Sequence, residues 1–182
     1  MSNKNPPLVN GEIYHVVSRA VGDTVVFDDE KDFYRGIFCI YEFNNDKPVN
    51  MWTRRRNRAI EKKVLGPTSL TLQERDKFVD VLAFSFMPNH LHFLVKIGGT
   101  PLSKIVKELK RYTSREANKI LRRIVAFWCE DYFDTYMRDA QHELKTRRYI
   151  ENNPVKALLV REPKEWPWSS ARFRDENGSL RL

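Results

Sequence analysis

The sequence has only two cysteines and no long apolar run, and each scarcity narrows what the protein can be. Cys39 and Cys129 are not in Cys-x-x-Cys spacing, so we expect free thiols in a reducing compartment and no zinc ribbon. No apolar stretch approaches the roughly 20 residues of a membrane helix, and the polar, proline-containing residues 1–7 differ from a signal peptide. Internal repeats and low-complexity tracts are also missing. We therefore expect a soluble, cytoplasmic protein.

Acidic residues are scarce relative to basic ones. The chain has 24 Asp and Glu against 32 Lys and Arg, which gives a net charge of +8. This excess suggests a polyanionic partner, although many basic proteins bind no nucleic acid. Hydrophobic residues make up 41% and aromatic residues 12% of the chain, enough for a packed core. At 182 residues, a single domain is the natural expectation.

Two of the four histidines flank a single leucine at the start of an apolar run. In a β-strand His90 and His92 share one face, about 6.6–7 Å apart at Cα, while Leu91 points to the other face. The two imidazoles can therefore converge on one metal ion. The alternative is an ordinary pair of strand histidines. His15, in an earlier predicted strand, is either a third ligand or a structural residue, and the structural interpretation is favoured.

Apolar periodicity predicts the order strand, helix, hairpin, helix, strand, helix. This order matches a ferredoxin-like, split βαβ fold of the α+β class, in which an antiparallel sheet has helices on one face. The tryptophan-containing residues 166–170 are expected to pack back on this body. The predicted strands cover 12–19, 79–86, a segment that starts at 90, and 132–138. One predicted helix begins at 28 or 29, and two others cover 103–125 and 141–152.

Positive charge concentrates in two segments. The predicted helix at 103–125 carries eight basic residues against Glu108 and Glu116, around a continuous apolar stripe. Residues 53–63 carry six basic residues against Glu61. Each segment is either a solvated surface or a phosphate-contact surface; we favour nucleic-acid contact for the helix and weigh the two readings equally for 53–63. The candidate DNA-binding residues are Lys104, Lys107, Lys110, Arg111, Arg115, Arg54, Arg55 and Arg56.

Three motifs resemble a known family. They are Met-Pro-Asn-His-Leu-His at 87–92, Tyr-Ile-Glu-Asn-Asn-Pro-Val-Lys-Ala at 149–157, and Trp-Ser-Ser at 168–170. Together they are similar to the single-tyrosine HUH transposases, and within them to the REP-associated tyrosine transposases, which act on palindromic repeats in bacterial chromosomes. The resemblance makes residues 1–182 one HUH transposase-like domain. Ala20, where members commonly have glycine, and a basic insertion at about 46–75 depart from the family pattern.

The resemblance assigns roles to residues of these motifs. His90 and His92 would be the metal-binding pair, Tyr149 the nucleophile, and Asn153 a polar residue that completes the metal site. Residues four apart share a helix face, so Tyr149 and Asn153 can address one point, although Pro154 disfavours helical geometry at Asn153. Pro154 either kinks the helix or begins a successor capped by Asn153. The implied cofactor is a divalent metal, Mg²⁺ or Mn²⁺.

The implied activity is endonuclease and strand-transfer chemistry on single-stranded or hairpin DNA. Tyr149 would form a 5′-phosphotyrosine bond and leave a 3′ hydroxyl, and the covalent bond would conserve the energy needed for religation. The main alternative is a domesticated, non-catalytic nucleic-acid-binding protein on the same fold. A metallohydrolase is disfavoured because residues 93–95 supply no further ligand. We expect a bacterial, nucleoid-associated location, no membrane partner, and either a monomer or a homodimer.

Overall fold

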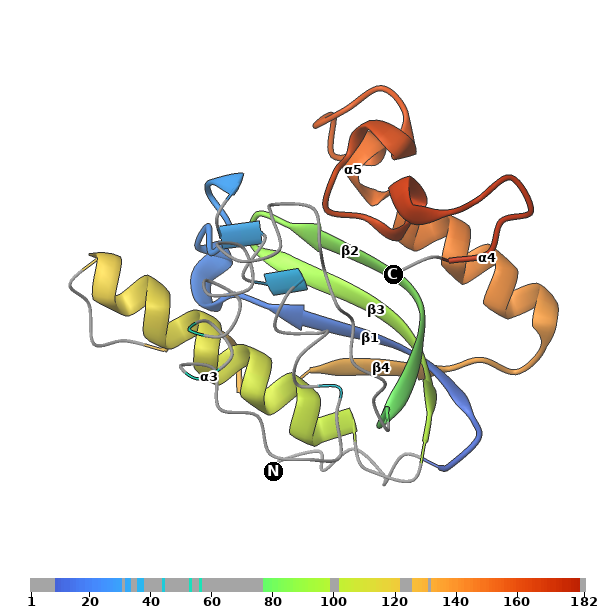
Figure 1. Cartoon of the computed structure of the whole chain (residues 1–182), viewed down its shortest axis with the longest axis horizontal. Coiled ribbons are helices and arrows are strands. Elements are labelled where there is room, and N and C mark those ends of the chain that lie inside the picture. Colours follow the sequence, from blue (N-terminus) through green and yellow to red (C-terminus); the bar gives the residue numbers. More distant parts are fainter. Residues whose placement is uncertain are drawn as a thin grey trace.

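Four antiparallel strands form the centre of the fold (Figure 1). They are β1 (Ile13–Arg19), β2 (Val79–Met87), β3 (His90–Ile97) and β4 (Phe133–Tyr136), in the spatial order β2-β3-β1-β4. All three neighbouring pairs are antiparallel. The computed structural model describes residues 9–30, 32–33, 36–37, 44, 53, 56, 77–98, 102–121, 126–130 and 132–180.

The strand order confirms the predicted ferredoxin-like, split βαβ fold. β3 lies between β1 and β2, and a two-residue turn at Pro88 and Asn89 joins β2 to β3 as a hairpin. Between β1 and β2 the described residues 30, 32, 33, 36 and 37 are helical, and the Asp32 backbone N–H donates to Asp29 Oδ1 over 2.9 Å. Asp29 is thus the cap of this helix. Of the predicted insertion at 46–75, residues 53 and 56 lie within the described part of the chain.

One face of the sheet carries a large aromatic core. Phe84, Phe86 and Phe93 point to this side, together with Leu91. Val106 of α3 (Leu102–Leu121) belongs to the same buried cluster, so we name this side the α3 face. The helix was predicted at 103–125; it begins one residue earlier, and 122–125 lie outside the described residues.

The opposite face carries a smaller core and the second helix. Ile150 of α4 (Ala140–Glu151) packs with Ala83, Leu94 and Met137, and we name this side the α4 face. The sequence predicted helices on one face of the sheet. In the structure α3 covers one face and α4 covers the other. The reason is visible in β3, whose residues 91–95 are all buried, as expected for a strand covered on both faces.

A short helix, α5 (Asn153–Lys156), follows α4 after a break at Asn152. The sequence predicted a successor helix capped by Asn153; this is wrong by one residue, because Asn152 is the cap and Asn153 is the first helical residue. Pro154 occupies one of the first two positions, where its missing N–H costs no hydrogen bond.

Residues 166–174, which we name the edge segment, lie along the outer edge of β2. Phe86 N donates to the Trp168 carbonyl over 2.9 Å, and the Trp166 indole donates to the Phe86 carbonyl over 2.8 Å. Ser169 forms a bridge with Ser85. The expected packing of the tryptophan segment against the body is confirmed. Among the described helices, none combines the length and apolar character needed to cross a membrane.

Candidate active site

His90 and His92 lie on the α4 face of β3, as the strand period predicts. Their ring centroids are 5.0 Å apart and the rings are nearly perpendicular, at 82°. His92 is buried, with 4% of its surface exposed, and His90 is partly buried at the end of the strand. The hairpin turn fixes this position, because Met87 pairs with His90 directly across it.

His15 of β1 completes a cluster of three imidazoles. Its Nε2 lies 2.9 Å from His92 Nδ1, and the two rings stack with centroids 5.2 Å apart. The strand register explains the contact: Val17 is the direct partner of His92, so His15 is its diagonal neighbour on the same face. Sequence reasoning left His15 as a minor possibility, because spacing along the chain says nothing about which strand lies beside β3.

Tyr149 of α4 lies over this cluster. Its ring centroid is 6.0 Å from that of His15 and 5.8 Å from that of His92, with both imidazoles approached edge to face. The side chain is 42% exposed, so the phenol borders both the histidines and solvent. Lys156 Nζ lies 4.5 Å from the centre of the phenol ring. The tyrosine and histidine motifs, which are far apart in sequence, therefore meet in the structure.

Asn153 lies one helical turn after Tyr149. Its side-chain amide donates to the Tyr149 carbonyl over 3.0 Å, and the Asn152 side chain donates in the same way to the Arg148 carbonyl over 2.8 Å. The two asparagines thus satisfy consecutive carbonyls where α4 ends. The contact that the structure gives Asn153 is with the helix backbone, one turn away from the phenol.

All three histidines of the cluster are held in the neutral form. Burial and, to a smaller extent, the charge of the neighbouring His142 together lower the pKa of His15 to about 4. Burial also lowers the pKa of His92 to about 3, with smaller effects from His90, His15 and Arg19. For His90, burial and then Arg19 lower the pKa to about 4, against an opposing effect of Asp23. Neutral imidazole is the form that coordinates metal ions.

The hydrogen bonds of the histidines bear on whether they can hold a metal. Within the described residues, no group of three or more His, Cys, Asp or Glu side chains is arranged to hold a metal ion, although three imidazoles touch one another. The nitrogens of His15 and His92 that approach each other share a hydrogen bond and are not aimed at a common ion. Asn89 Oδ1 lies 2.6 Å from His90 Nδ1, so Nδ1 is the donor and Nε2 keeps its lone pair.

The same logic applies to His92. If its Nδ1 donates to His15 Nε2, then His92 Nε2 also keeps its lone pair. A hydrogen bond from Nδ1 that fixes the tautomer is the usual environment of a metal-binding histidine. In this tautomer His90 and His92 fit a metal site as a two-nitrogen donor set, which requires oxygen ligands from elsewhere.

Arg19 is a further residue of this face that sequence reasoning missed. It is exposed at the end of β1, directly opposite His90 in the strand register. Its charge reaches both His90 and His92, whose pKa values it lowers. Lys156, which lies in a motif noted from the sequence, was also given no role. Both cations border the imidazole and phenol cluster on the solvent side.

The predicted DNA-binding residues of α3 lie on the other side of the sheet. Lys104, Lys107, Arg111 and Arg115 are exposed, and Lys104 Nζ lies 4.9 Å from the centre of the Phe78 ring. Lys110 instead donates to the carbonyls of Cys129 and Glu130, over 2.9 and 3.2 Å. The structure thus does not bring these residues together with the histidines. Arg54 and Arg55 lie outside the described residues, and Arg56 is exposed.

Comparisons with known proteins agree with this architecture. Residues 49–153 match the model of the protein family described as IS200-like transposases. A solved structure of a REP-associated tyrosine transposase bound to a REP hairpin shares the fold, with a TM-score of 0.65 and 14% identity over 100% of this chain and 99% of that chain. A protein of Deinococcus radiodurans R1 described as a transposase is 18% identical over 83% and 97% of the two chains, with a TM-score of 0.40. Among curated proteins, none matches the sequence.

Proposed function

Because the chain belongs to the family of IS200-like transposases, whose model matches more than half of it, we propose that it cuts and rejoins single-stranded DNA. Family membership supports a DNA-binding role in transposition. The finer proposal is a metal-dependent endonuclease and strand transferase that acts on hairpin DNA through a 5′-phosphotyrosine intermediate. The observation that carries it is the exposed phenol of Tyr149, whose ring centre lies 6.0 Å from that of the partly buried His15 and 5.8 Å from that of the buried His92, both neutral.

Tyr149 would act as the nucleophile. Its phenol gives up its proton and its oxygen forms a bond to the phosphorus of a phosphodiester, while the bond from phosphorus to the 3′ oxygen breaks. The released oxygen takes up a proton and becomes a 3′ hydroxyl, so that the step involves no net gain or loss of protons. The reverse attack by a 3′ hydroxyl on the phosphotyrosine restores the DNA and frees the phenol. No external energy source is needed, because each step exchanges one phosphodiester for another.

The metal of this reaction would be held by His90 and His92 through their Nε2 atoms, with the Asn153 amide oxygen as a further ligand. A bound Mg²⁺ or Mn²⁺ would supply Lewis-acid neutralisation of the charge on the phosphate oxygens. In this arrangement His15 is the hydrogen-bond partner that orients His92 and is not itself a ligand. Arg19 and Lys156 supply positive charge beside the phosphate that is attacked.

We propose hairpin DNA as the partner. The REP-associated transposase that shares this fold was solved with a REP hairpin. The proposed phosphate contacts outside the active site are Lys104, Lys107, Lys110, Arg111 and Arg115 of α3, together with Arg54, Arg55 and Arg56 of the basic segment 53–63.

The position of α3 supports this division of roles. Lys110 reaches Cys129 and Glu130, and Cys129 N donates to the Arg19 carbonyl over 2.9 Å. The middle of α3 therefore lies near the end of the sheet that carries Arg19 and His90. A DNA strand bound at this end can continue from the α4 face toward α3, where phosphate contacts add affinity without taking part in the chemistry.

Covalent capture tests the proposal. Labelled single-stranded oligonucleotides that contain a hairpin are incubated with the protein and Mg²⁺ or Mn²⁺, then resolved on a denaturing gel. Wild type should give a protein band shifted by covalently bound DNA, and Tyr149→Phe should give none. Tyr132→Phe, which removes a hydroxyl on the other side of the molecule, is the matched control and should behave as wild type. Hairpin binding without any adduct would instead support a non-catalytic DNA-binding protein, and an adduct in Tyr149→Phe would assign the chemistry to another tyrosine.

A further inference from the structure

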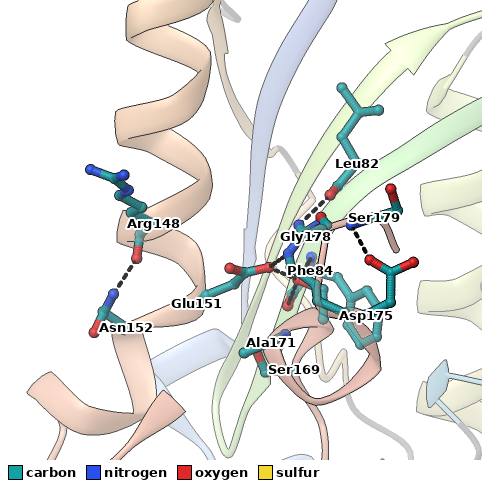
Figure 2. A network of polar contacts seen from close by, with 12 residues as sticks. Leu82, Phe84, Arg148, Glu151, Asn152, Ser169, Ala171, Asp175, Gly178 and Ser179 are labelled. Carbon is teal, nitrogen blue, oxygen red and sulfur yellow. Dashed lines mark hydrogen bonds and ion pairs between the residues drawn. The ribbon is translucent and has the colours of Figure 1, made fainter. Parts of the chain in front are cut away.

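We propose that Glu151 is a positioning residue, which acts with Ser170 and Arg174 of the edge segment to fix the rotation of α4 and so the location of Tyr149. This inference rests on the proposed function, because it concerns the nucleophile of that reaction. None of the three side chains contacts the histidines through the bonds described here, and none was singled out for a role by its sequence motif. Figure 2 shows Glu151 reaching from α4 toward the edge segment and β2.

The first step of the argument is the geometry at Glu151. A single carboxylate oxygen, Oε1, accepts hydrogen bonds from Arg174 Nε over 2.6 Å and from the Ser170 hydroxyl over 2.7 Å. The arginine and glutamate side chains are 11% and 12% exposed. A charged pair at this depth is screened little by solvent, so it holds its geometry better than a surface ion pair does.

The second step is that both partners are anchored to β2 independently. The Ser170 hydroxyl also accepts from Phe84 N over 3.0 Å. Arg174 Nη2 donates to the Leu82 carbonyl over 2.7 Å, and its Nη1 donates to the Gly178 carbonyl over 2.9 Å. These contacts lie at an irregularity of the β2–β3 register between Val81 and Ala83. Glu151 is thus tied to two points of one strand, which resists sliding as well as rotation.

The third step links this anchor to the nucleophile. Tyr149, Ile150 and Glu151 are consecutive on α4, so their side chains leave the helix about 100° apart. Ile150 is fully buried in the core of the α4 face, and Glu151 is bound toward the β2 edge. Because the side chains of Ile150 and Glu151 are both held in place, the rotation of α4 about its axis is fixed. This rotation places the side chain of Tyr149 over the histidines. At a helix radius of about 5–6 Å, a rotation of about 10° moves a side chain by about 1 Å, and a displacement of that size can cost about 10²-fold in rate.

The test is the single-turnover rate of adduct formation at saturating hairpin oligonucleotide with Mn²⁺. Glu151→Ala should slow the reaction by about 10–100-fold while leaving the dissociation constant of the hairpin within about twofold. Glu151→Gln, which keeps an oxygen that accepts from Ser170 and Arg174, should recover much of the rate. Ser170→Ala removes one of the two anchors and should give an intermediate loss.

A matched control separates positioning from general stability. Thr113→Val keeps the shape of a buried side chain but removes the 2.7 Å hydrogen bond from the Trp128 indole, on the α3 face. Urea or guanidinium is adjusted so that Thr113→Val and Glu151→Ala have the same fraction folded. Positioning predicts that the rate per folded molecule falls in Glu151→Ala and not in Thr113→Val. An equal fall in both variants overturns the inference.

Hydrogen exchange gives a readout that does not depend on cleavage. Glu151→Ala should increase amide exchange at residues 146–157 of α4 and α5 and leave α3 unchanged, and unchanged exchange at 146–157 overturns the inference. Absence of an adduct in wild type would contradict the proposed function, and the exchange result would still decide whether Glu151 anchors α4. A wild-type adduct with an undiminished rate in Glu151→Ala would leave the proposed function standing and remove the positioning role.

Discussion

The two faces of the sheet are built from the same strands but differ in what covers them. On the α3 face, Phe84, Phe86 and Phe93 pack with each other and with a long helix. On the α4 face the buried apolar cluster is small, and the space beside it holds the histidines and Tyr149. The comparison indicates that one face supplies most of the stability. The other face, where less apolar surface is buried, has room for polar chemistry.

β3 contributes side chains to both faces, and these side chains alternate between the two faces along the strand. Leu91 points into the α3 face and is fully buried, while His90 and His92 on either side of it point into the α4 face. Substitution of either histidine should therefore mainly affect catalysis, whereas substitution of Leu91 should mainly affect stability.

The largest expected effect is on the α4 face. His90→Ala or His92→Ala should reduce cleavage by at least about 10²–10³-fold, the range for loss of one preorganised electrostatic group, because the proposed metal site loses a ligand. Hairpin affinity should stay nearly intact, since phosphate contacts elsewhere supply it. Gel-shift titration and cleavage rates of the same samples check this. Full cleavage by wild type in EDTA would rule out the metal mechanism.

The next effect is on stability and comes from the residue between the two histidines. Leu91→Ala should lower the free energy of unfolding by about 2–5 kcal/mol, because it leaves a cavity in the α3 face. The corresponding fall in Tm is about 5–15 °C, measured by thermal denaturation. Cleavage per folded molecule at low temperature should be preserved. A loss of cleavage in the folded fraction would show that the two faces are coupled through β3.

Acid should lower the stability of the protein through the histidines of the α4 face. The pKa of His92 is about 3 in the folded chain, against 6.5 for an ordinary histidine, so below pH 6.5 the unfolded chain binds a proton that the folded chain does not. Stability is complete above pH 6.5 and falls as the pH falls, by up to about 1.4 kcal/mol per pH unit from His92 alone. The lowered pKa values of His15 and His90 act in the same direction.

Urea unfolding in EDTA at pH 7, 6 and 5 measures this effect. His92→Gln removes the titrating group, so its stability should depend less on pH than that of wild type. Equal slopes in the two proteins would mean that the charged imidazole is accommodated in the folded state.

The smallest expected effect is on the outer surface of α3. Lys107→Gln combined with Arg115→Gln should reduce the slope of log binding constant against log salt by up to about 1.4 units, at about 0.7 per phosphate contact to a single strand. Cleavage at saturating DNA should survive. Lys110 is left unchanged, because its replacement would also remove its hydrogen bonds to the carbonyls of Cys129 and Glu130.

The control for this experiment is Lys96→Gln with Lys164→Gln, which removes two exposed charges from other parts of the molecule. It changes net charge equally and should leave the salt slope as in wild type. If both double variants reduce the slope equally, α3 contributes only to the overall field of the protein.

How far the sequence could predict this structure depends on whether a feature is local. The shared face of His90 and His92 follows from the strand period, and the β-strand order follows from the order of elements. The contact of His15 with His92 and the position of Arg19 opposite His90 depend on the register of β1 against β3. Register between strands more than 70 residues apart leaves no periodic signal in either strand.

The same limit applies to contacts made by the helices. The apolar stripe of α3 indicates which side is buried, but not that the carbonyls of Cys129 and Glu130 come within reach of Lys110. The Asn152 cap was missed because two successive asparagines offer the same capping chemistry and only the backbone angles distinguish them. The bonds from Glu151 to Ser170 and Arg174 join segments that the motifs leave unconnected.

The edge segment has a consequence for the order in which the protein matures on the ribosome. Its bonds to Phe84 and Leu82 join residues 86 and 92 positions apart, and at about 5–20 residues per second the second partner emerges on the order of 5–20 s after the first. During that interval the outer edge of β2 is unpaired and must be shielded or kept soluble. A nascent chain thus contains Tyr149 and all its histidines before it contains Arg174, which binds Glu151 of α4. Assembly of the site is therefore a late event in biosynthesis.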